Sequence, residues 1–581
     1  MAINCNRSIG PTLATKGSKW WIAGGLFLVV LGVYALTSPG RIDIIDGQIR
    51  YEVTVNWLLN GRPIVADRWI APLMGVPGRG GLRYASYGAP ASVLAIPLVW
   101  LRLYSLDGGQ FVFSLTSTIL GAAIAPLLFL FYLELGVATR RALFWTMVSS
   151  FATLLWPVAN SSFDNAQHAF FAFAAAYAGF LSARRKSAAY ASLAGLMAGV
   201  LVMYQEYFLL LVAPLALLTI DWTPTGGFPL SLPIQRPESI LGRVLSAPRR
   251  ATQAAWSLIR AAWNGPGEAR SSCVRFVLFC TAVSVGVVLS LAYNHMRFGS
   301  WLQNGKNVEG VAHKGLLFRN PLSGFLTLLI SPGKSIFLYS PPIVLAVLGI
   351  GQLWRRRPEL ATLIGSSSLV LVFFLSWIAF VGGDWCWGPR YLAVLLPLWA
   401  LALPFTVGHG VGKKLALAII GVGFLVQALA LSVENQRFFF ERGLNDFFWA
   451  EDSWFYFKHS ALIARVGEAI SLREGVPPTA HLFNSIPAPE LTTYCPLGPP
   501  RNIPRKLAPT WMRQFQIYFL PRPWPLWMSW LPPGGRPIDM GPWLVGLLST
   551  CILGAGLIYR GLQVREPAKL ALQVAVLDES P

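Results

Sequence analysis

Charged residues are scarce in this sequence. Asp, Glu, Lys and Arg make up 13% of its 581 residues, while 54% are hydrophobic and the mean hydropathy is +0.52. Soluble domains carry roughly 25% charged residues, so this composition excludes a soluble multidomain protein. It indicates an all-α polytopic membrane protein, whose helices satisfy their own backbone groups inside the bilayer.

Acidic residues are rarer than basic ones. The chain has 26 Asp and Glu against 47 Lys and Arg, a formal net charge of +21. In a soluble protein that excess would suggest a nucleic-acid partner, but no helix-turn-helix, zinc-finger or RNA-recognition pattern is present. In a membrane protein it is expected, because cytoplasmic loops and anionic lipid favour Lys and Arg.

The sequence also lacks metal-binding cysteine motifs and internal repeats, which narrows the class of protein. The six cysteines lie far apart, without a CxxC or a Cys/His metal spacing. An internal repeat is missing, which counts against transporters built from inverted repeats.

Apolar segments, by contrast, recur throughout the chain. Crossing the ~30 Å hydrocarbon core takes about 20 residues in a helix. On this basis we predict about twelve transmembrane helices near residues 20–37, 110–133, 142–158, 167–183, 188–203, 207–220, 274–293, 335–353, 360–381, 391–409, 415–433 and 542–559.

Segment 90–106 is ambiguous, because it is apolar but short and contains two prolines. Counting it as a span would place the clusters Arg140–Arg141 and Arg184–Lys186 outside the cytoplasm. Treating it as a helix on or in the outer surface places both clusters inside, as the positive-inside rule favours. The topology then has both termini in the cytoplasm.

This topology predicts three parts of the chain. Residues 1–433 form a transmembrane region, with an outer loop at 38–109 and a basic cytoplasmic loop at 221–273. Residues 434–541 form an extracytoplasmic region rich in Pro and Trp, and residues 542–581 hold the last transmembrane helix and a cytoplasmic tail. Further outer loops are predicted at 159–166, 294–334 and 382–390.

Several carboxylates gather on this predicted outer face. Asp43 and Asp46 follow the first span, and Asp164 follows the third. Glu206 and Asp384 lie on the same side. Carboxylates at the ends of apolar helices are costly unless they are used or paired, so these residues are candidates for a functional site.

After Asp46 the sequence QIRYEVTVNWLLNG has the spacing of an amphipathic helix in the membrane interface. Asp46 at its start would suit the helix dipole and could simply cap the helix. Capping and catalysis are compatible, so both interpretations stay open.

The order of motifs resembles a known family. An acidic residue after the first span, the interfacial helix with Arg-Tyr and Asn-Gly, and LRYASYGAPASVLAIPLVW are followed by NSSFDNAQH, YNHMRFGSWLQNG, LLISPGKSIFLYSPP and GGDWCWGPRYLAVLLPL. Together they resemble the multipass GT-C glycosyltransferases of the protein mannosyltransferase and aminoarabinose transferase type. The resemblance covers about residues 20–435.

The resemblance implies roles for the outer acids. Asp46 best matches the catalytic base of the first outer loop, with Asp43 as the second candidate, and Asp164 matches the second acidic residue. A carboxylate can accept the proton that an acceptor hydroxyl or amine loses on attack at the anomeric carbon. The family donors are polyprenyl-phosphate sugars, and a single carboxylate with inversion suffices.

The donor phosphate needs cationic partners. Arg390 and Lys334 are the first candidates, although an arginine at this depth could also snorkel to the interface. SPGKS around Lys334 lacks the Walker A spacing. Where aminoarabinose transferases carry a lysine before a proline, this chain has Arg83, Tyr84 and Tyr87 before Pro90, which argues against aminoarabinose specificity. Weaker candidates for the phosphate are Arg83, Arg297, Lys306, Lys314 and Arg319, and Tyr84 and Tyr87 are further candidates for binding the sugar donor.

Two further kinds of site are open. Asp46, Asp164 and His168 could hold a divalent metal if their loops converge. Trp385 and Trp387 could stack on sugar rings or anchor the chain in the aromatic belt.

The sequence therefore predicts an inverting membrane glycosyltransferase. It would transfer a sugar from a polyprenyl-phosphate donor to a glycan, lipid or protein acceptor, in a prokaryotic inner membrane with the active site outside the cytoplasm. The alternatives are a transporter or lipid flippase, which should carry ionisable groups at mid-membrane, and a non-catalytic scaffold, in which Asp46, Asp164 and Arg390 would lie far apart.

Overall fold

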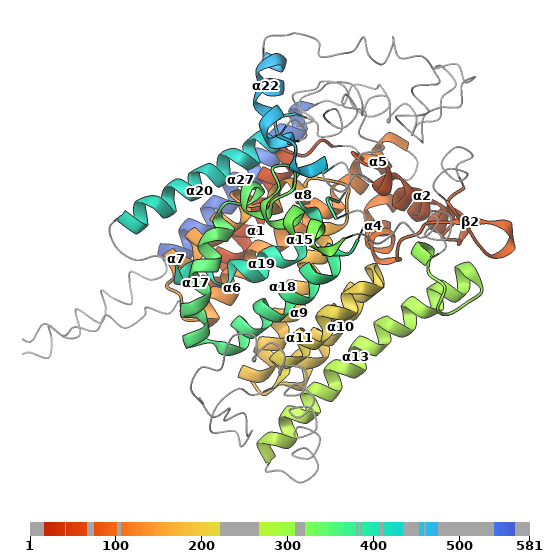
Figure 1. Ribbon diagram of the computed structural model, residues 1–581, viewed down its shortest axis with the longest axis horizontal. Helices are drawn as coiled ribbons and strands as arrows, with labels where there is room; N and C mark the ends of the chain where they lie inside the picture. Colours follow the sequence, from red (N-terminus) through yellow and green to blue (C-terminus); the bar gives the residue numbers. More distant parts are fainter. Residues whose placement is uncertain are drawn as a thin grey trace, which may run out of the picture. The chain divides into compact units, whose positions relative to one another are not determined.

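The structure is a computed structural model that describes residues 17–40, 42–66, 75–101, 106–220, 267–307, 320–378, 381–383, 386–406, 411–433, 438, 453–457, 460–473 and 540–563 (Figure 1). The predicted basic loop 221–273 and region 434–541 lie mostly outside these residues. So do Asp384, Trp385, Lys314 and Arg319.

The chain forms two compact units. The first comprises Met1–Phe170, Asn294–Gln352 and Val372–Pro581, and the second comprises Phe171–Tyr293 and Leu353–Leu371. Among the described candidate residues, Glu206 belongs to the second unit and the others belong to the first, which contains both sides of each contact reported for the site below.

The described residues are almost entirely helical, as predicted. Up to the second outer loop the elements are α1 (Ser18–Leu36), α2 (Ile45–Asn60), β1 (Val76–Pro77), η1 (Arg79–Gly81), β2 (Arg83–Tyr84), α4 (Pro90–Trp100), α5 (Leu106–Ser114), α6 (Thr116–Glu134), α7 (Thr139–Phe151) and α8 (Leu155–Ala159). The strands β1 and β2 form a small antiparallel pair, with Val76 opposite Tyr84.

Helices also make up the rest of the described chain. They are α9 (Asn165–Arg184), α10 (Ala188–Tyr204), η2 (Glu206–Phe208), α11 (Leu209–Ala216), η3 (Leu217–Thr219), α13 (Gly267–Phe298), α15 (Pro321–Ile330), α16 (Ile336–Tyr339), α17 (Pro342–Arg356), α18 (Pro358–Ser376), η4 (Arg390–Leu395), α19 (Leu396–Ala400), η5 (Leu403–Phe405), α20 (Val411–Ala430), η7 (Ser453–Phe455), α22 (Ala461–Arg473) and α27 (Met540–Gln563).

Six helices of the described chain are long and apolar enough to cross a membrane. They are Ser18–Leu36, Gly109–Glu134, Arg270–Phe298, Pro358–Ser376, Gly412–Ala430 and Gly541–Gln563. Each coincides with a predicted span, which confirms the multipass helical class. The number of twelve spans stays a prediction.

Prolines break three of the other predicted spans into shorter pieces, because proline cannot donate to the carbonyl four residues earlier. Segment 142–158 divides between α7 and α8, where Pro157 cannot donate to the carbonyl of Thr153, which accepts from the N–H of Trp156 at 3.3 Å instead. Segment 335–353 divides between α16 and α17 at Pro341. Segment 391–409 consists of η4, α19 and η5, and α19 ends at Ala400, four residues before Pro404.

The ambiguous segment 90–106 contains a short helix. α4 has 11 residues, which gives a length of about 16 Å at 1.5 Å per residue, about half of the hydrocarbon core. α4 contacts α2 and α5 (Figure 1). Its length therefore supports the outer-surface interpretation over a spanning one.

The first and last helices of the described chain, α1 and α27, lie side by side in the first unit (Figure 1). Glycines allow their backbones to approach closely: a Cβ added to Gly25 would lie 2.5 Å from the carbonyl oxygen of Gly554. Small residues at such contacts are typical of helix packing in membranes.

Candidate functional site

The site is built where the segment after α1 meets the segment before α9. The hydroxyl Oγ1 of Thr37 accepts hydrogen bonds from Trp156 Nε1 at 3.0 Å and from Asn160 Nδ2 at 2.8 Å. These bonds connect the end of α1 to the second outer loop. They place the acidic residues that follow each helix next to one another.

Asp43 binds this second loop directly. Its carboxylate accepts hydrogen bonds from Ser161 Oγ at 2.7 Å and from the backbone N–H of Ser162 at 2.6 Å. Burial raises the pKa of Asp43, against these hydrogen bonds, which lower it. Both carboxylate oxygens of Asp43 are used to hold the two loops together, so its geometry fits a structural role better than that of a base.

Asp46 lies in the first turn of α2, as predicted, but it does not cap the helix. The N-cap residue of α2 is Ile44, and it makes no side-chain capping hydrogen bond. The Asp46 side chain is 11% exposed, and Oδ2 lies 3.9 Å from Nη2 of Arg390. Asp46 is thus a largely buried acid that has a cation beside it.

One face of helix α2 is buried against its neighbours. Ile49 and Val53 are buried, and Ser92 of α4 donates a hydrogen bond to the carbonyl of Arg50 at 3.0 Å. The predicted Asn-Gly end is confirmed: α2 ends at Asn60, and Gly61 takes the left-handed conformation with φ of +64°.

Arg50, one helical turn after Asp46, is a site residue that the sequence analysis missed. Its Nη2 lies 2.9 Å from Oδ2 of Asp164, and both side chains are almost fully buried. The Tyr87 ring covers the guanidinium face, with Cζ 4.1 Å from the ring centroid. The available signal was the spacing of four residues, which places Asp46 and Arg50 on one face of α2.

Asp164 is surrounded by positive charge. Burial raises the pKa of this carboxyl, but Arg50, His168 and Arg390 together lower it more, so that the pKa of Asp164 lies well below its usual range. Nε2 of His168 is 3.4 Å from Oδ2 of Asp164, one turn along α9. Asp164 is therefore ionised at neutral pH.

Arg390 joins this group from the start of η4. Its Nε donates to the carbonyl of Gly383 at 2.6 Å, its Nη1 to Oδ1 of Asn165 at 3.4 Å, and its Cζ lies 3.5 Å from the Phe163 ring centroid. Arg390 is buried rather than snorkelling to the surface.

Four predicted site residues thus meet in one cluster, Asp43, Asp46, Asp164 and Arg390, together with Arg50. The residues come from the ends of three predicted spans that are distant in sequence. Among the residues that the structure describes, two donor groups of Arg50, Nε and Nη1, are buried without a hydrogen-bond partner. Buried unsatisfied guanidinium donors are costly, and an anionic or carbonyl group of a ligand would satisfy them.

Tyr87, one of the first-loop residues predicted to bind the sugar donor, lies beside this cluster. Tyr87 has Arg50 over its ring, and Nζ of the exposed Lys306 lies 4.8 Å from its centroid. Arg297 donates to the carbonyls of Ala85 and Tyr87 at 2.7 and 2.9 Å, which fixes this segment.

Two other predicted residues in the first loop make structural contacts. Arg83 donates to the carbonyl of Gly75 at 2.8 Å, and the Tyr84 ring packs edge-on against Phe298. Tyr87 is therefore the predicted first-loop residue that contacts the cluster itself.

Lys334 and Trp387 have contacts that differ from their predicted roles. Lys334 is fully buried, and its Nζ donates to the carbonyls of Cys386 and Gly388 at 2.8 and 3.3 Å. Trp387 is buried edge-on against Tyr339 with a centroid distance of 5.1 Å. Both side chains are therefore buried among protein groups, and their roles toward a phosphate or a sugar stay predictions.

The proposed metal ligands do not assemble. Among the described residues, no group of three His, Cys, Asp or Glu is arranged to hold a metal ion. Asp164 instead pairs with Arg50, whose positive charge disfavours a cation at the same carboxylate. The metal interpretation of Asp46, Asp164 and His168 is therefore not supported by this geometry.

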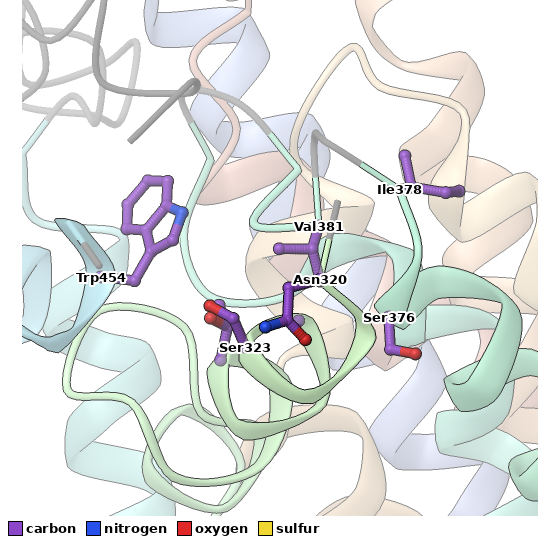
Figure 2. A pocket seen from close by; sticks show the side chains of 8 residues that line it. Asn320, Ser323, Ser376, Ile378, Val381 and Trp454 are labelled. Atoms are coloured by element: carbon purple, nitrogen blue, oxygen red, sulfur yellow. The ribbon is translucent and has the colours of Figure 1, made fainter. Parts of the chain in front are cut away.

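A pocket lies near Trp454 (Figure 2). It is lined by Asn320, Ser323, Gly324, Thr327, Ser376, Ile378, Val381 and Trp454, and its volume is about 250 Å³ including its open mouth. Ligand sites usually measure about 300–1,000 Å³. The pocket is thus too small for a lipid-linked sugar, and it contains none of the charged residues of the cluster.

No model of a known protein family matches the sequence, and no curated protein matches it. Solved structures with a similar arrangement include ArnT from Cupriavidus metallidurans bound to undecaprenyl phosphate, with a TM-score of 0.42, 12% identity, and coverage of 83% of this chain and 75% of ArnT. A second is AglB, an oligosaccharyltransferase from Archaeoglobus fulgidus in complex with an inhibitory peptide and a dolichol-phosphate, with a TM-score of 0.40, 12% identity, and coverage of 74% of this chain and 59% of AglB.

The chain spans less than two thirds of the length of AglB. Similarity of this degree assigns neither a substrate nor site residues.

Proposed function

We propose that this protein is an integral membrane glycosyltransferase that transfers a sugar from a polyprenyl-phosphate donor to an extracytoplasmic acceptor. The observation that carries the proposal is the single cluster formed by Asp46, Asp164, Arg50 and Arg390. A scaffold without catalytic function gives no reason for these residues to converge. The motif resemblance to GT-C enzymes supplies the reaction class.

Asp46 is the proposed base. Unlike Asp43 and Asp164, it is not bound through a short hydrogen bond or ion pair within the described chain, and it retains some solvent access. It can therefore accept a proton from an acceptor hydroxyl or amine as that group attacks the anomeric carbon. Arg390 beside it keeps positive charge at the reaction centre.

Arg50 and Arg390 are the proposed phosphate partners. Asp164 neutralises part of their charge and orients Arg50 through the 2.9 Å ion pair, while the buried Nε and Nη1 of Arg50 have no hydrogen-bond partner among the described residues and would donate to the phosphate. Guanidinium groups hold phosphate oxygens through charge-assisted hydrogen bonds, which suits a leaving polyprenyl phosphate. Transfer with inversion then needs a single carboxylate base.

The test is transferase activity of the purified full chain with polyprenyl-phosphate sugars as donors. Loss of a general base usually lowers the rate about 10²–10⁴-fold, so Asp46→Asn should be nearly inactive. Its thermal unfolding midpoint should stay close to that of the unchanged protein, because its nearest described charge partner is 3.9 Å away.

Asp43→Asn is the matched control. The asparagine amide can still accept from the Ser162 N–H and can donate to the Ser161 hydroxyl, so activity should be largely kept. Full activity in Asp46→Asn, or equal loss in both variants, would remove Asp46 from the role of base. Uptake of a solute into liposomes without any sugar transfer would favour a transporter instead.

A further inference from the structure

Arg390 lies at the end of a described loop of residues 386–390 and contacts Gly383. Gly383 and Gly388 both take the left-handed conformation, with φ of +73° and +61°. The Gly383 carbonyl accepts the 2.6 Å hydrogen bond from Arg390 Nε. The position of the Arg390 guanidinium therefore depends on the conformation of this backbone. Glycines permit many backbone conformations, so other contacts are needed to fix it.

Lys334 holds the same loop from its inner side. Its ammonium donates to the carbonyls of Cys386 and Gly388 and lies 3.5 Å from Cys386 Sγ. Its own backbone is fixed by a 3.0 Å hydrogen bond from the Lys334 N–H to Ser331 Oγ. A fully buried ammonium is costly unless its donors are satisfied, so this arrangement constrains both the lysine and the loop.

The chain beyond α20 covers this lysine. Nζ of Lys334 lies 4.7 Å from the centroid of the Trp454 ring, and the Trp454 carbonyl accepts a 3.1 Å hydrogen bond from the N–H of Gly333. Ser460 Oγ donates to the carbonyl of Pro332 at 2.7 Å. The Trp454 ring also packs against Gly382, where an added Cβ would lie 2.7 Å from its Cε2 atom.

We propose that Lys334 is a positioning residue and that Trp454 completes its clamp. The ammonium fixes the backbone at Cys386 and Gly388 so that Arg390 stays beside Asp46, and the indole shields the ammonium from water. The catalytic part of this inference rests on the proposed function. The mechanical part, that Lys334 holds the loop closed, does not.

Cys386 provides a reporter of loop opening that is independent of catalysis. Its side chain is buried beside Lys334, so a thiol reagent reaches it only when the loop opens. The experiment uses the full chain with the other five cysteines replaced by alanine, and the rate of maleimide labelling is measured. Lys334→Met should raise that rate roughly tenfold to hundredfold, the effect of losing hydrogen bonds from a charged donor.

Lys334→Arg should restore part of the protection, since it keeps the charge and donors. Lys306→Met, at an exposed lysine outside the clamp, should leave the labelling rate unchanged. Trp454→Leu removes only the indole and should give a smaller increase in labelling. This variant keeps the inference testable if Lys334→Met does not fold. Unchanged labelling of Cys386 in both Lys334→Met and Trp454→Leu would overturn the inference.

Activity measurements separate positioning from a general structural role. If Lys334 acts through Arg390, then Lys334→Met should lower kcat/KM, and the double variant Lys334→Met/Arg390→Leu should be no slower than Arg390→Leu alone. Additive losses would overturn the coupling to Arg390. Faster labelling together with full activity of Asp46→Asn would instead retain the clamp and reject the proposed function.

Discussion

Arg50 and Asp164 form a buried ion pair, with Nη2 of Arg50 2.9 Å from Oδ2 of Asp164 and side-chain exposures of 3% and 5%. The pair joins the first and second outer loops inside the candidate site. Arg50 belongs to α2 and Asp164 is the residue just before α9, so the pair holds these two segments of the first unit together.

We expect Arg50→Met to be strongly destabilising. Removing one partner of a buried pair leaves the other charge uncompensated, which typically costs about 3–5 kcal/mol. The double variant Arg50→Met/Asp164→Leu should lose less stability than the sum of the two single variants, because neither charge is then left alone. Unfolding of the purified proteins in detergent measures each change, and strict additivity would contradict the pairing.

The stability contributed by Asp164 should depend on pH. Because the folded pKa of Asp164 lies below its unfolded value of about 3.9, its ionised form stabilises the fold above that pH, and the contribution is lost as the pH falls below about 4. The difference in unfolding midpoint between the unchanged protein and Asp164→Asn should therefore shrink from pH 6 to pH 3. A constant difference over this range would contradict the lowered pKa.

The stability contributed by Asp43 should change with pH in the opposite direction to that of Asp164. Burial raises the folded pKa of Asp43 above about 3.9, so its contribution to stability is fully present below that pH and is lost as the pH rises through the folded pKa. Relative to Asp43→Asn, the unchanged protein should gain stability as the solution is acidified. The same series of unfolding measurements tests both residues. If the stability difference changed with pH in the same direction for Asp43 and Asp164, one of the two pKa directions would be wrong.

Gly47 should not tolerate a side chain. An added Cβ would lie 2.6 Å from the Cβ of Ser162 and 3.1 Å from its carbonyl oxygen, so Gly47→Ala must push α2 away from the second outer loop. Overpacking of this kind costs about 1–3 kcal/mol, and it should also lower transferase activity by separating Arg50 from Asp164.

Gly24→Ala in α1 is the matched control. No atom lies within 4 Å of a Cβ added at Gly24, so this change should be neutral or should stabilise α1 by up to about 1 kcal/mol. Equal unfolding midpoints for Gly47→Ala and Gly24→Ala would contradict the close contact at Ser162.

Much of the fold follows from local sequence. The apolar runs of α1, α18, α20 and α27 are each confirmed as single helices, because a long uninterrupted apolar run satisfies its own backbone in lipid. The segments predicted at 142–158, 335–353 and 391–409 were wrong as single helices. Hydropathy alone does not take into account that proline lacks the backbone N–H needed to continue a helix.

The site was predictable only in part. The sequence by itself determined that Asp43, Asp46 and Asp164 follow apolar helices, since chain order and apolar length decide that placement. It did not determine which of these acids would be bound by serines, which would pair with Arg50 and which would lie beside Arg390. It also did not show that the Lys334 ammonium would be buried against the carbonyls of Cys386 and Gly388.

Those distinctions were decided by tertiary structure. In the sequence, Asp43 and Asp46 are two similar carboxylates in one predicted outer loop. In the structure they have different partners, because the 160–164 segment packs against Asp43 but leaves Asp46 facing Arg390. Each pairing joins residues far apart in the chain. The energy of a buried charge depends on the groups that packing brings around it, which no local sequence pattern contains.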